Sequence, residues 1–334
     1  MGLRELGEFG LIHRIRGRVH PGSGVIQGIG DDCAMTQITP GWTSLSTVDM
    51  LIEGIHFDRS YTPPYLLGRK SLSVNVSDIA ACGGVPRHVL LGIALPPGID
   101  TPFIDQFMDG FLAVCDEEGV TLIGGDTCSS RDGVVISVTL LGEQRPERVV
   151  RRAGARPDDL IVVSGSIGDS AVGLQLLRQG ERDPAHPCIA RHLDPTPRTR
   201  LGLILAGECR VSAMIDISDG LLADLGHILT SSGVGARLDT RAIPLSPLAR
   251  SEAIRIGIDP LVPPLTGGED YELLFTLPPS EERSLEPISR ELSLPLTVIG
   301  SIQEGEGITL TDGDTPISPP RLAAGYDHFR EVHL

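Results

Sequence analysis

The sequence predicts a two-domain protein of the α+β class, with α/β-like layers of helices and strands. Its 334 residues exceed the length of one typical domain, so each half is long enough to bury a core. Strand-like and helix-like segments occur in both halves without strict alternation, which favours mixed layers and a cleft between two domains. The segment QRPERVVRRAGARPDD, at residues 144–159, is basic and broken by proline, which indicates a hinge. We therefore expect domains at residues 1–148 and 149–334.

The first half of the chain predicts helices and strands joined by turns. The N-terminal MGLRELGEFGLIHRIRG mixes charged and apolar residues, which indicates an amphipathic helix, and a glycine-rich loop follows at residues 22–29. Helical spacing predicts helices at residues 66–83 and 101–118. Apolar runs predict strands at residues 43–51, 89–95, 120–123 and 134–141.

The second half predicts another set of the same elements. Apolar runs predict strands at residues 160–164 and 213–217, at the end of 266–276, and at 296–302. A turn at 165–169 precedes a helix for which Asp169 or Ser170 is the expected N-cap, and further helices are expected from 201 and over 221–229. Residues 181–199 are rich in proline and predict a loop, and Asp312–Gly313 predicts a hairpin turn.

Charge and cysteine usage limit the classes of function. Lys and Arg number 28 against 44 Asp and Glu, a net charge of −16, which argues against binding nucleic acid or an anionic membrane. The six cysteines lie far apart without a C-x-x-C pair, a pattern typical of a reducing cytoplasm rather than of a zinc site or disulfide scaffold. No apolar run reaches transmembrane length, so we expect a cytoplasmic protein.

Aspartates follow glycines or apolar runs at several places along the chain. The segments that carry them are GIGDDCA, STVDML, VNVSDIA, GGDT and IDISDGLL, with Asp32, Asp49, Asp78, Asp126, Asp216 and Asp219. Taken singly, each is more simply explained as a helix cap or turn residue. Jointly, they supply more negative charge than one cation needs, and Mg²⁺ prefers carboxylate ligands that it shares with phosphates. We therefore expect a cluster of divalent cations that holds phosphate groups.

The segment Ile215–Leu222 is the most specific local signal. Ser218 and Asp219 precede Gly220 and a helix, so their backbone N–H groups are expected to face a phosphate or a metal-bound phosphate. An ordinary capped helix explains Ser218 and Asp219 but not Asp216. A Walker A loop, a Rossmann fingerprint and a G-x-S-x-G elbow are all missing from the sequence.

Other polar residues have two interpretations. Arg151 and Arg152 in the hinge suit a phosphate or a solvated basic turn equally well. His56 is more often a packing histidine than a catalytic one. Glu269 and Asp270 follow two glycines, which suits either a ligand-binding loop or a turn into a strand.

The motifs together resemble the thiamine-monophosphate kinase family, a relative of aminoimidazole ribonucleotide synthetase, selenophosphate synthetase and a hydrogenase-maturation protein. The resemblance runs in order from Gly7 to Phe329, through GEFGLI, GIGDDCA, DMLIEGIHF, VNVSDIAACGG, LIGGDT, RAGARPDD, GDSAVGL, IDISDGLLADLGHI, TGGEDYELLF and GYDHF. It implies a two-domain aminoimidazole ribonucleotide synthetase-like fold. It also implies a homodimer whose N-terminal sheets pair into a barrel, and ATP-dependent phosphorylation of thiamine monophosphate to thiamine diphosphate.

The resemblance also implies roles for single residues. The implied Mg²⁺ ligands are Asp32, Thr47, Val48, Asp49, Asp78, Asp126, Asp216 and Asp219. Implied ATP contacts are Gly125, Asp126, Arg152 and Ser218, and implied contacts of thiamine monophosphate are His56, Glu269 and Tyr326. The family usually has a hydroxyl residue where this chain has Val48, so that position can serve a metal only through its backbone carbonyl.

The implied reaction needs no acid or base, because the acceptor is already a phosphate anion. Metals and Arg152 would lower the repulsion between two polyanions, with Asp49, Asp126 and Asp216 acting electrostatically, so we expect direct in-line transfer of the γ-phosphate. The alternative within this superfamily is an enzyme of the selenophosphate or aminoimidazole ribonucleotide synthetase type. The loop at 22–29 has no cysteine and the chain ends EVHL, which disfavours the selenium and hydrogenase-maturation relatives. A cation-binding regulatory protein would bind metal without turning over ATP.

Overall fold

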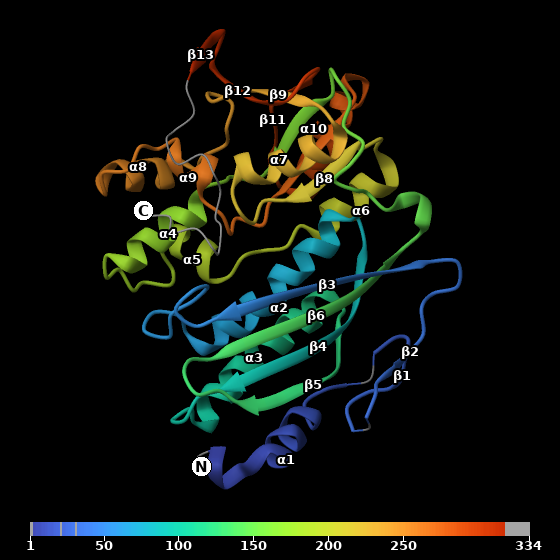
Figure 1. Ribbon diagram of the computed structural model, residues 1–334, viewed down its shortest axis with the longest axis vertical. Coiled ribbons are helices and arrows are strands. Elements are labelled where there is room, and N and C mark those ends of the chain that lie inside the picture. The colour runs from blue at the N-terminus through green and yellow to red at the C-terminus, as the bar shows by residue number, and fades with distance from the viewer. Residues whose placement is uncertain (1–2, 21, 31, 318–334) are drawn as a thin grey trace. The chain divides into compact units, whose positions relative to one another are not determined.

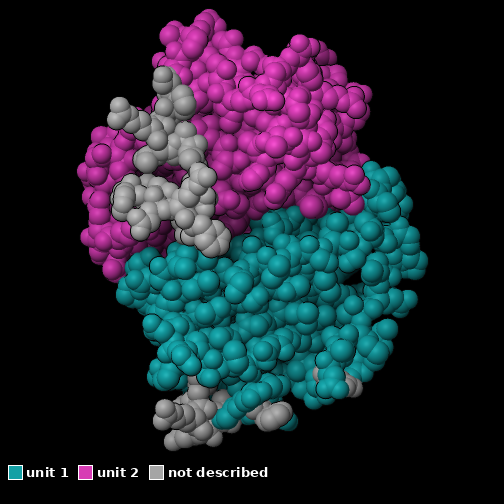
Figure 2. All heavy atoms as spheres, in the orientation of Figure 1, with its two compact units in different colours: residues 1–79, 84–147 teal, residues 80–83, 148–334 magenta. Residues whose placement is uncertain are grey.

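The computed structural model describes residues 3–20, 22–30 and 32–317, which fall into two compact units. Unit 1 comprises Met1–Ile79 and Gly84–Glu147, and unit 2 comprises Ala80–Gly83 and Arg148–Leu334 (Figure 2). Each unit has its own sheet and helices, as the α+β prediction requires (Figure 1). No helix in the described residues is long and apolar enough to span a membrane.

Unit 1 is built on a sheet with the strand order β3-β6-β4-β5 in its described part. The strands of this unit are β1 (Val25–Gln27), β2 (Met35–Thr36), β3 (Thr43–Ile52), β4 (Val85–Leu95), β5 (Thr121–Ser129) and β6 (Val135–Gln144), and its helices are α1 (Leu3–Arg16), α2 (Pro64–Ala81) and α3 (Thr101–Glu118). β6 pairs antiparallel with β3 and β4, whereas β4 and β5 are parallel. The strands β3 and β5 are therefore the two edges of the sheet.

Helices α2 and α3 cover one face of this sheet (Figure 1). Two glycines let the helices approach closely, as the small residues of α2 predict. A Cβ on Gly68 would lie 2.0 Å from the carbonyl oxygen of Phe107, and one on Gly110 would lie 1.8 Å from that of Tyr65. Any larger residue at either position would force the helices apart.

Unit 2 is built on a sheet with the order β13-β12-β9-β11-β7-β10-β8 in its described part. Its strands are β7 (Leu160–Ser164), β8 (Ala213–Asp216), β9 (Gly235–Asp239), β10 (Leu273–Leu277), β11 (Leu296–Gln303), β12 (Gly307–Asp312) and β13 (Thr315–Ile317). Its helices are α4 (Asp169–Arg178), α5 (Pro187–Leu193), α6 (Thr199–Glu208), α7 (Leu221–Ser232), α8 (Pro247–Arg255), α9 (Val262–Thr266) and α10 (Glu282–Leu292), with a short 3-10 turn η2 (Pro279–Glu281). A further 3-10 turn, η1 (Pro146–Arg148), spans the sequence boundary between the units. Among the described strands, the neighbours β9 and β12 are parallel and the other pairs antiparallel.

The sheet of unit 2 buries both of its faces. Ile161 and Val163 of β7 belong to a core cluster with the apolar face of α7, whereas Val162 belongs to a second cluster with residues of α6 and α10. Successive residues of a strand point to opposite faces, so β7 needs apolar residues at every position. This explains its continuous apolar run, LIVVS.

Four local predictions were wrong. The glycine-rich loop expected at residues 22–29 contains the short strand β1. The expected loop at residues 181–199 contains the helix α5, which begins at Pro187, a residue that favours the first turn of a helix. The expected strand 120–123 continues as β5 to Ser129, so the GGDT segment lies within a strand rather than after it. Helix α4 has its N-cap at Gly168, and neither Asp169 nor Ser170 caps it.

Candidate active site

In unit 1, β3 and α2 bring two of the predicted aspartates into electrostatic contact. Thr47 and Asp49 are two residues apart on β3 and point to the same face, and the Thr47 hydroxyl donates a hydrogen bond to Asp78 of α2. Burial, and next the negative charge of Asp78, raise the pKa of Asp49 to about 7. Both effects penalise the ionised carboxylate, and a bound cation would reverse the penalty.

Val48 points the other way. Its side chain is 58% exposed on the opposite face of β3 from Thr47 and Asp49. Any metal role at this position would therefore use the backbone carbonyl.

Asp126 lies at the other edge of the same sheet. Asp49, Val138, Leu91 and Gly125 are register partners in a row across β3, β6, β4 and β5, and Asp126 is the next residue of β5. Three interstrand spacings amount to about 14 Å. Within a single chain, Asp126 is therefore too far from Asp49 to share one ion with it.

The remaining predicted residues of unit 1 are positioned by the backbone. Gly125 has φ +154°, and a Cβ there would lie 1.9 Å from the carbonyl oxygen of Leu91, so only glycine fits. His56 follows β3, and its Nδ1 accepts the N–H of Ile52 at 3.1 Å. A neutral His56 ring therefore carries its proton on Nε2. Asp32 is exposed in a loop.

The complete aspartate cluster is not assembled within the described chain. Over residues 3–20, 22–30 and 32–317, no group of three or more His, Cys, Asp or Glu side chains is arranged to hold a metal ion. The donor set that unit 1 does assemble, two carboxylates and a hydroxyl from Asp49, Asp78 and Thr47, suits a hard cation such as Mg²⁺. The residues present therefore fit the expected metal, but only as part of a site.

In unit 2, the predicted phosphate-facing N–H groups of the Ile215–Leu222 segment already have an acceptor. The N–H groups of Ser218, Asp219 and Gly220 donate to Oδ2 of Asp224 at 3.0–3.1 Å. The prediction that these groups face a phosphate was therefore wrong. Burial raises the pKa of Asp224 to about 7, against the opposing effect of the backbone hydrogen bonds. Asp216, at the end of β8, is 3% exposed.

The loop at residues 267–271 lies directly beside that segment. Backbone N–H groups of Glu269 and Tyr271 donate to the carbonyls of Ser218 and Ile217 at 2.8 and 2.9 Å. Glu269 and Tyr271 both have left-handed backbones, with φ of +64° and +52°. Such a conformation is costly for residues other than glycine, which makes this loop a functional candidate.

Asp270 and Glu272 anchor this loop with buried carboxylates. Asp270 accepts the N–H groups of Gly168 and Ser170 at 2.6 and 3.2 Å, and so caps α4, which has no side-chain cap of its own. Glu272 accepts hydrogen bonds from Ser164, Arg191 and Arg198. Burial raises the pKa of Asp270 to about 7. Glu269 lies in sequence between the two glycines of the loop and these two buried carboxylates, and its side chain is 26% exposed.

The chain matches known protein families over most of its length. Residues 30–144 match the N-terminal domain of AIR synthase related proteins, and residues 156–313 match the C-terminal domain. Thiamine-monophosphate kinase of Salmonella typhimurium is 39% identical over 332 residues, covering 97% of this chain and 98% of that protein. The enzyme of the same name from Aquifex aeolicus is 38% identical over 333 residues, covering 98% and 100%.

The chain belongs to the thiamine-monophosphate kinase family.

Solved structures of this kinase family have the same fold. Thiamine-monophosphate kinase from Stenotrophomonas maltophilia K279a matches with a TM-score of 0.81 at 38% identity, covering 90% of this chain and 96% of that one. AaThiL complexed with AMPPCP and TMP matches with a TM-score of 0.77 at 36% identity, covering 98% and 99%. The predicted fold class is confirmed, and the chain is a thiamine-phosphate kinase.

Sequence reasoning missed several residues around the loop at residues 267–271 and the neighbouring Ile215–Leu222 segment. Asp224, Glu272, Arg191 and Arg198 were assigned no role, although Glu272 interrupts the apolar run YELLFTL, which is a usable signal. A buried charge directly before a fully buried strand must have a partner. Of the predicted site residues, Arg152 is exposed, and Tyr326 lies outside the described residues.

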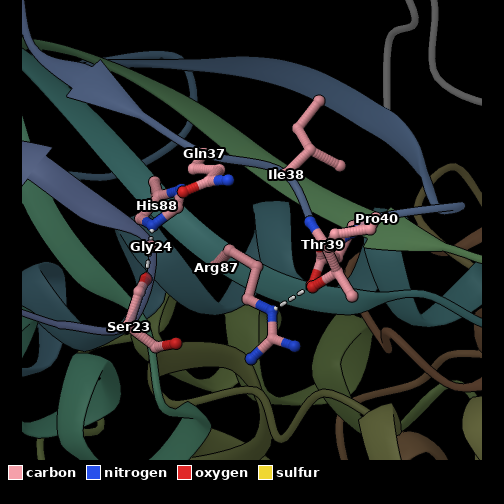
Figure 3. A pocket seen from close by; sticks show the side chains of 9 residues that line it. Ser23, Gly24, Gln37, Ile38, Thr39, Pro40, Arg87 and His88 are labelled. Carbon is pink, nitrogen blue, oxygen red and sulfur yellow. Dashed lines mark hydrogen bonds and ion pairs between the residues drawn. The ribbon is translucent and has the colours of Figure 1, made fainter.

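A pocket of about 240 Å³ opens elsewhere in unit 1 (Figure 3). It lies beside the β1–β2 hairpin, where the guanidinium of Arg87 pairs with Glu143 at 2.8 Å and the ring of His88 bonds to the carbonyl of Ser23. None of the predicted site residues lines it. The ion pair is internally neutral, so the pocket offers little attraction to a polyanion.

Proposed function

We propose that this kinase transfers the γ-phosphate of ATP directly and in line to thiamine monophosphate, with Mg²⁺. The observation that carries the proposal is the full-length similarity to thiamine-monophosphate kinases, which includes AaThiL complexed with AMPPCP and TMP. AMPPCP is an ATP analogue that cannot pass on its γ-phosphate, and both ligands match the two proposed substrates. The free cysteines are compatible with work in the cytoplasm, where we propose that the enzyme acts.

The proposed site consists of the residues that the family resemblance implies. The Mg²⁺ ligands are Asp32, Thr47, Val48 through its carbonyl, Asp49, Asp78, Asp126, Asp216 and Asp219; Gly125, Asp126, Arg152 and Ser218 contact ATP; and His56, Glu269 and Tyr326 contact thiamine monophosphate. Bound Mg²⁺ would supply positive charge between the two phosphate chains. Asp49 must be ionised to hold it, and Arg152 would donate hydrogen bonds to phosphate oxygens.

The acceptor removes the need for a general base. A phosphate monoester is already anionic at neutral pH, so no proton has to leave before it attacks. The barrier lies in bringing two polyanions into line, and the enzyme lowers it by positioning and charge neutralisation. We therefore propose that Asp49, Asp126 and Asp216 act electrostatically, through the metals that they hold, and that no phospho-enzyme forms.

We further propose that the enzyme is a homodimer in which the two unit 1 sheets close into one barrel. The edge strand β3 exposes Val48 and Met50 on its open face, and an exposed apolar edge strand favours pairing with another strand. We propose that the barrel joins β3 of one chain to β5 of the other, the two edge strands of the sheet. Asp126 of the partner subunit would then lie on the strand next to that of Asp49, which overcomes the separation of about 14 Å within one chain.

A complementation experiment tests the kinase and the dimer together. Asp49→Asn and Asp126→Asn should each lower kcat by about 100-fold or more, the effect of losing one electrostatic group in an active site. A heterodimer of one chain of each variant has one site with both aspartates intact, so about half of the wild-type activity should return. The assay is conversion of thiamine monophosphate to thiamine diphosphate with ATP and Mg²⁺.

The outcomes separate the two proposals. An inactive heterodimer beside an active wild type would refute the shared site and leave the kinase intact. A wild-type protein that hydrolyses no ATP and forms no thiamine diphosphate would refute the kinase itself.

A further inference from the structure

A buried histidine lies against the carboxylate of Glu269. Nδ1 of His192, on α5, is 3.1 Å from Oε2 of Glu269, and the His192 side chain is 3% exposed. The Ser170 hydroxyl, on α4, lies 3.2 Å from the same Nδ1. Sequence analysis gave no role to His192, and considered Ser170 only as a possible N-cap.

The contact with Glu269 indicates which ring nitrogen of His192 carries a hydrogen. An ionised Glu269 carboxylate can approach Nδ1 only if that nitrogen carries a hydrogen, so Nδ1–H is the donor. Ser170 is fully buried and limits rotation of the ring from the α4 side. The N–H of Ser170 is in turn held by Asp270, the residue next to Glu269.

Glu269 needs such support. Its φ of +64° is unfavourable for a residue with a side chain, and persists only where the surroundings fix it. Its own N–H donates to the carbonyl of Ser218, which holds the backbone. The contact with His192 is made by the side chain, and it sets the direction of the carboxylate.

We propose that His192, braced by Ser170, is a positioning residue that aims the Glu269 carboxylate at the substrate. This inference rests on the proposed function, in which Glu269 contacts thiamine monophosphate. That substrate contains a cationic ring, and a carboxylate attracts it most when its orientation is fixed before binding. His192 is 3% exposed and acts through Glu269 rather than by touching the substrate.

Two substitutions of similar polarity separate orientation from simple packing. His192→Asn keeps an N–H close to the position of Nδ1, whereas His192→Gln places its amide near Nε2 and leaves the Glu269 carboxylate without that donor. His192→Gln should raise KM for thiamine monophosphate about tenfold, the effect of one hydrogen bond to a charged group. His192→Asn should stay within about threefold of wild type by the same reasoning, and kcat and KM for ATP should change little in both. The exposed His227 of α7 offers a control, because His227→Gln should leave every constant unchanged.

A Glu269→Gln background completes the test. If His192 acts through Glu269, adding His192→Gln to Glu269→Gln should raise KM no further, since the two residues form one unit. Equal KM values for His192→Asn and His192→Gln, or a full additional loss in the double variant, would overturn the proposal. Failure of the kinase itself would show differently, as a wild-type protein that forms no thiamine diphosphate. Thermal unfolding of each variant checks that both amide variants fold, and the Asn–Gln comparison is made on folded protein.

Discussion

Replacing Glu272 by Gln tests whether a buried ion cluster stabilises unit 2. The Glu272 side chain is 1% exposed, and its two oxygens accept hydrogen bonds from Ser164 at 2.5 Å, from Arg191 at 2.7 Å and from Arg198. Gln has nearly the same shape but no charge, and one of its two terminal atoms is a donor. That donor would face a guanidinium, so at least one hydrogen bond would be lost.

The cost follows from what remains after the substitution. Two guanidinium groups would keep their positive charges without the carboxylate between them, and Nε of Arg191 already has no hydrogen-bond partner. Removing one partner of a buried ion pair costs about 3–5 kcal/mol of stability. Arg191 and Arg198 are 21% and 17% exposed, so water relieves part of the charge, and we expect about 3 kcal/mol. For a unit of about 190 residues this lowers Tm by roughly 6–12 °C.

Differential scanning calorimetry at neutral pH measures this change. The matched control is Glu291→Gln, which removes an exposed ion pair with Arg200. The side chain of Arg200 is 71% exposed and that of Glu291 is 56% exposed. An exposed pair contributes about 0–1 kcal/mol, so the control should change Tm by no more than about 4 °C. Equal shifts in Tm for Glu272→Gln and Glu291→Gln would refute the reasoning.

Three further substitutions give distinct outcomes. Because burial raises the pKa of Asp270 to about 7 from 3.8, the folded chain keeps a proton that the unfolded chain releases, and stability falls as pH rises through that interval. Between about pH 5.5 and pH 7, the unfolding free energy of the wild type should therefore fall by about 2 kcal/mol, whereas that of Asp270→Asn should not. Urea titrations measure this difference, and an equal pH dependence of the two proteins would disprove it. Gly268→Ala places a Cβ 2.1 Å from the carbonyl oxygen of Ser218, so we expect about 1–3 kcal/mol of destabilisation with a raised KM for thiamine monophosphate; an unchanged KM would count against the loop as a substrate contact. Asp100→Ala removes the acceptor for the Phe103 N–H at the start of α3 and should cost about 1 kcal/mol by chemical denaturation without affecting KM, whereas a loss of activity at full stability would contradict a capping role.

Local sequence pattern predicted the elements that have a clear periodicity or a clear cap. Helix α3 was predicted at residues 101–118 and lies at Thr101–Glu118, because Asp100 and Gly119 mark its two ends. Strand β7 was likewise predicted at residues 160–164, where it lies. Helix α5 was not predicted, because its seven residues lie between prolines that indicate a loop.

The candidate site was predictable in its residue types but not in its contacts. Asp270 lies 102 residues from the Gly168 N–H that it accepts, and no local rule connects a loop carboxylate to a helix so far away in sequence. Asp224 is a different case, because it lies only four to six residues from the N–H groups that it accepts, and the sequence reasoning did not consider it as their acceptor. Sequence indicated that the segment was special, but not that Asp224, in the helix that directly follows, would accept its N–H groups.

The loop at residues 267–271 is held mainly by charge and hydrogen bonding. Asp270 and Glu272 fix its C-terminal side through α4, Arg191 and Arg198, and the carbonyls of the Ile215–Leu222 segment fix its backbone. Ionic anchors specify direction as well as position, whereas apolar burial tolerates rotation. A loop that must keep Glu269 at φ +64° therefore gains more from buried carboxylates than from leucines, even though the carboxylates are costly to desolvate. On this argument, replacing Glu272, Arg191 and Arg198 together by apolar residues of similar volume would preserve Tm while raising KM for thiamine monophosphate, and an unchanged KM in that triple variant would show that packing alone suffices.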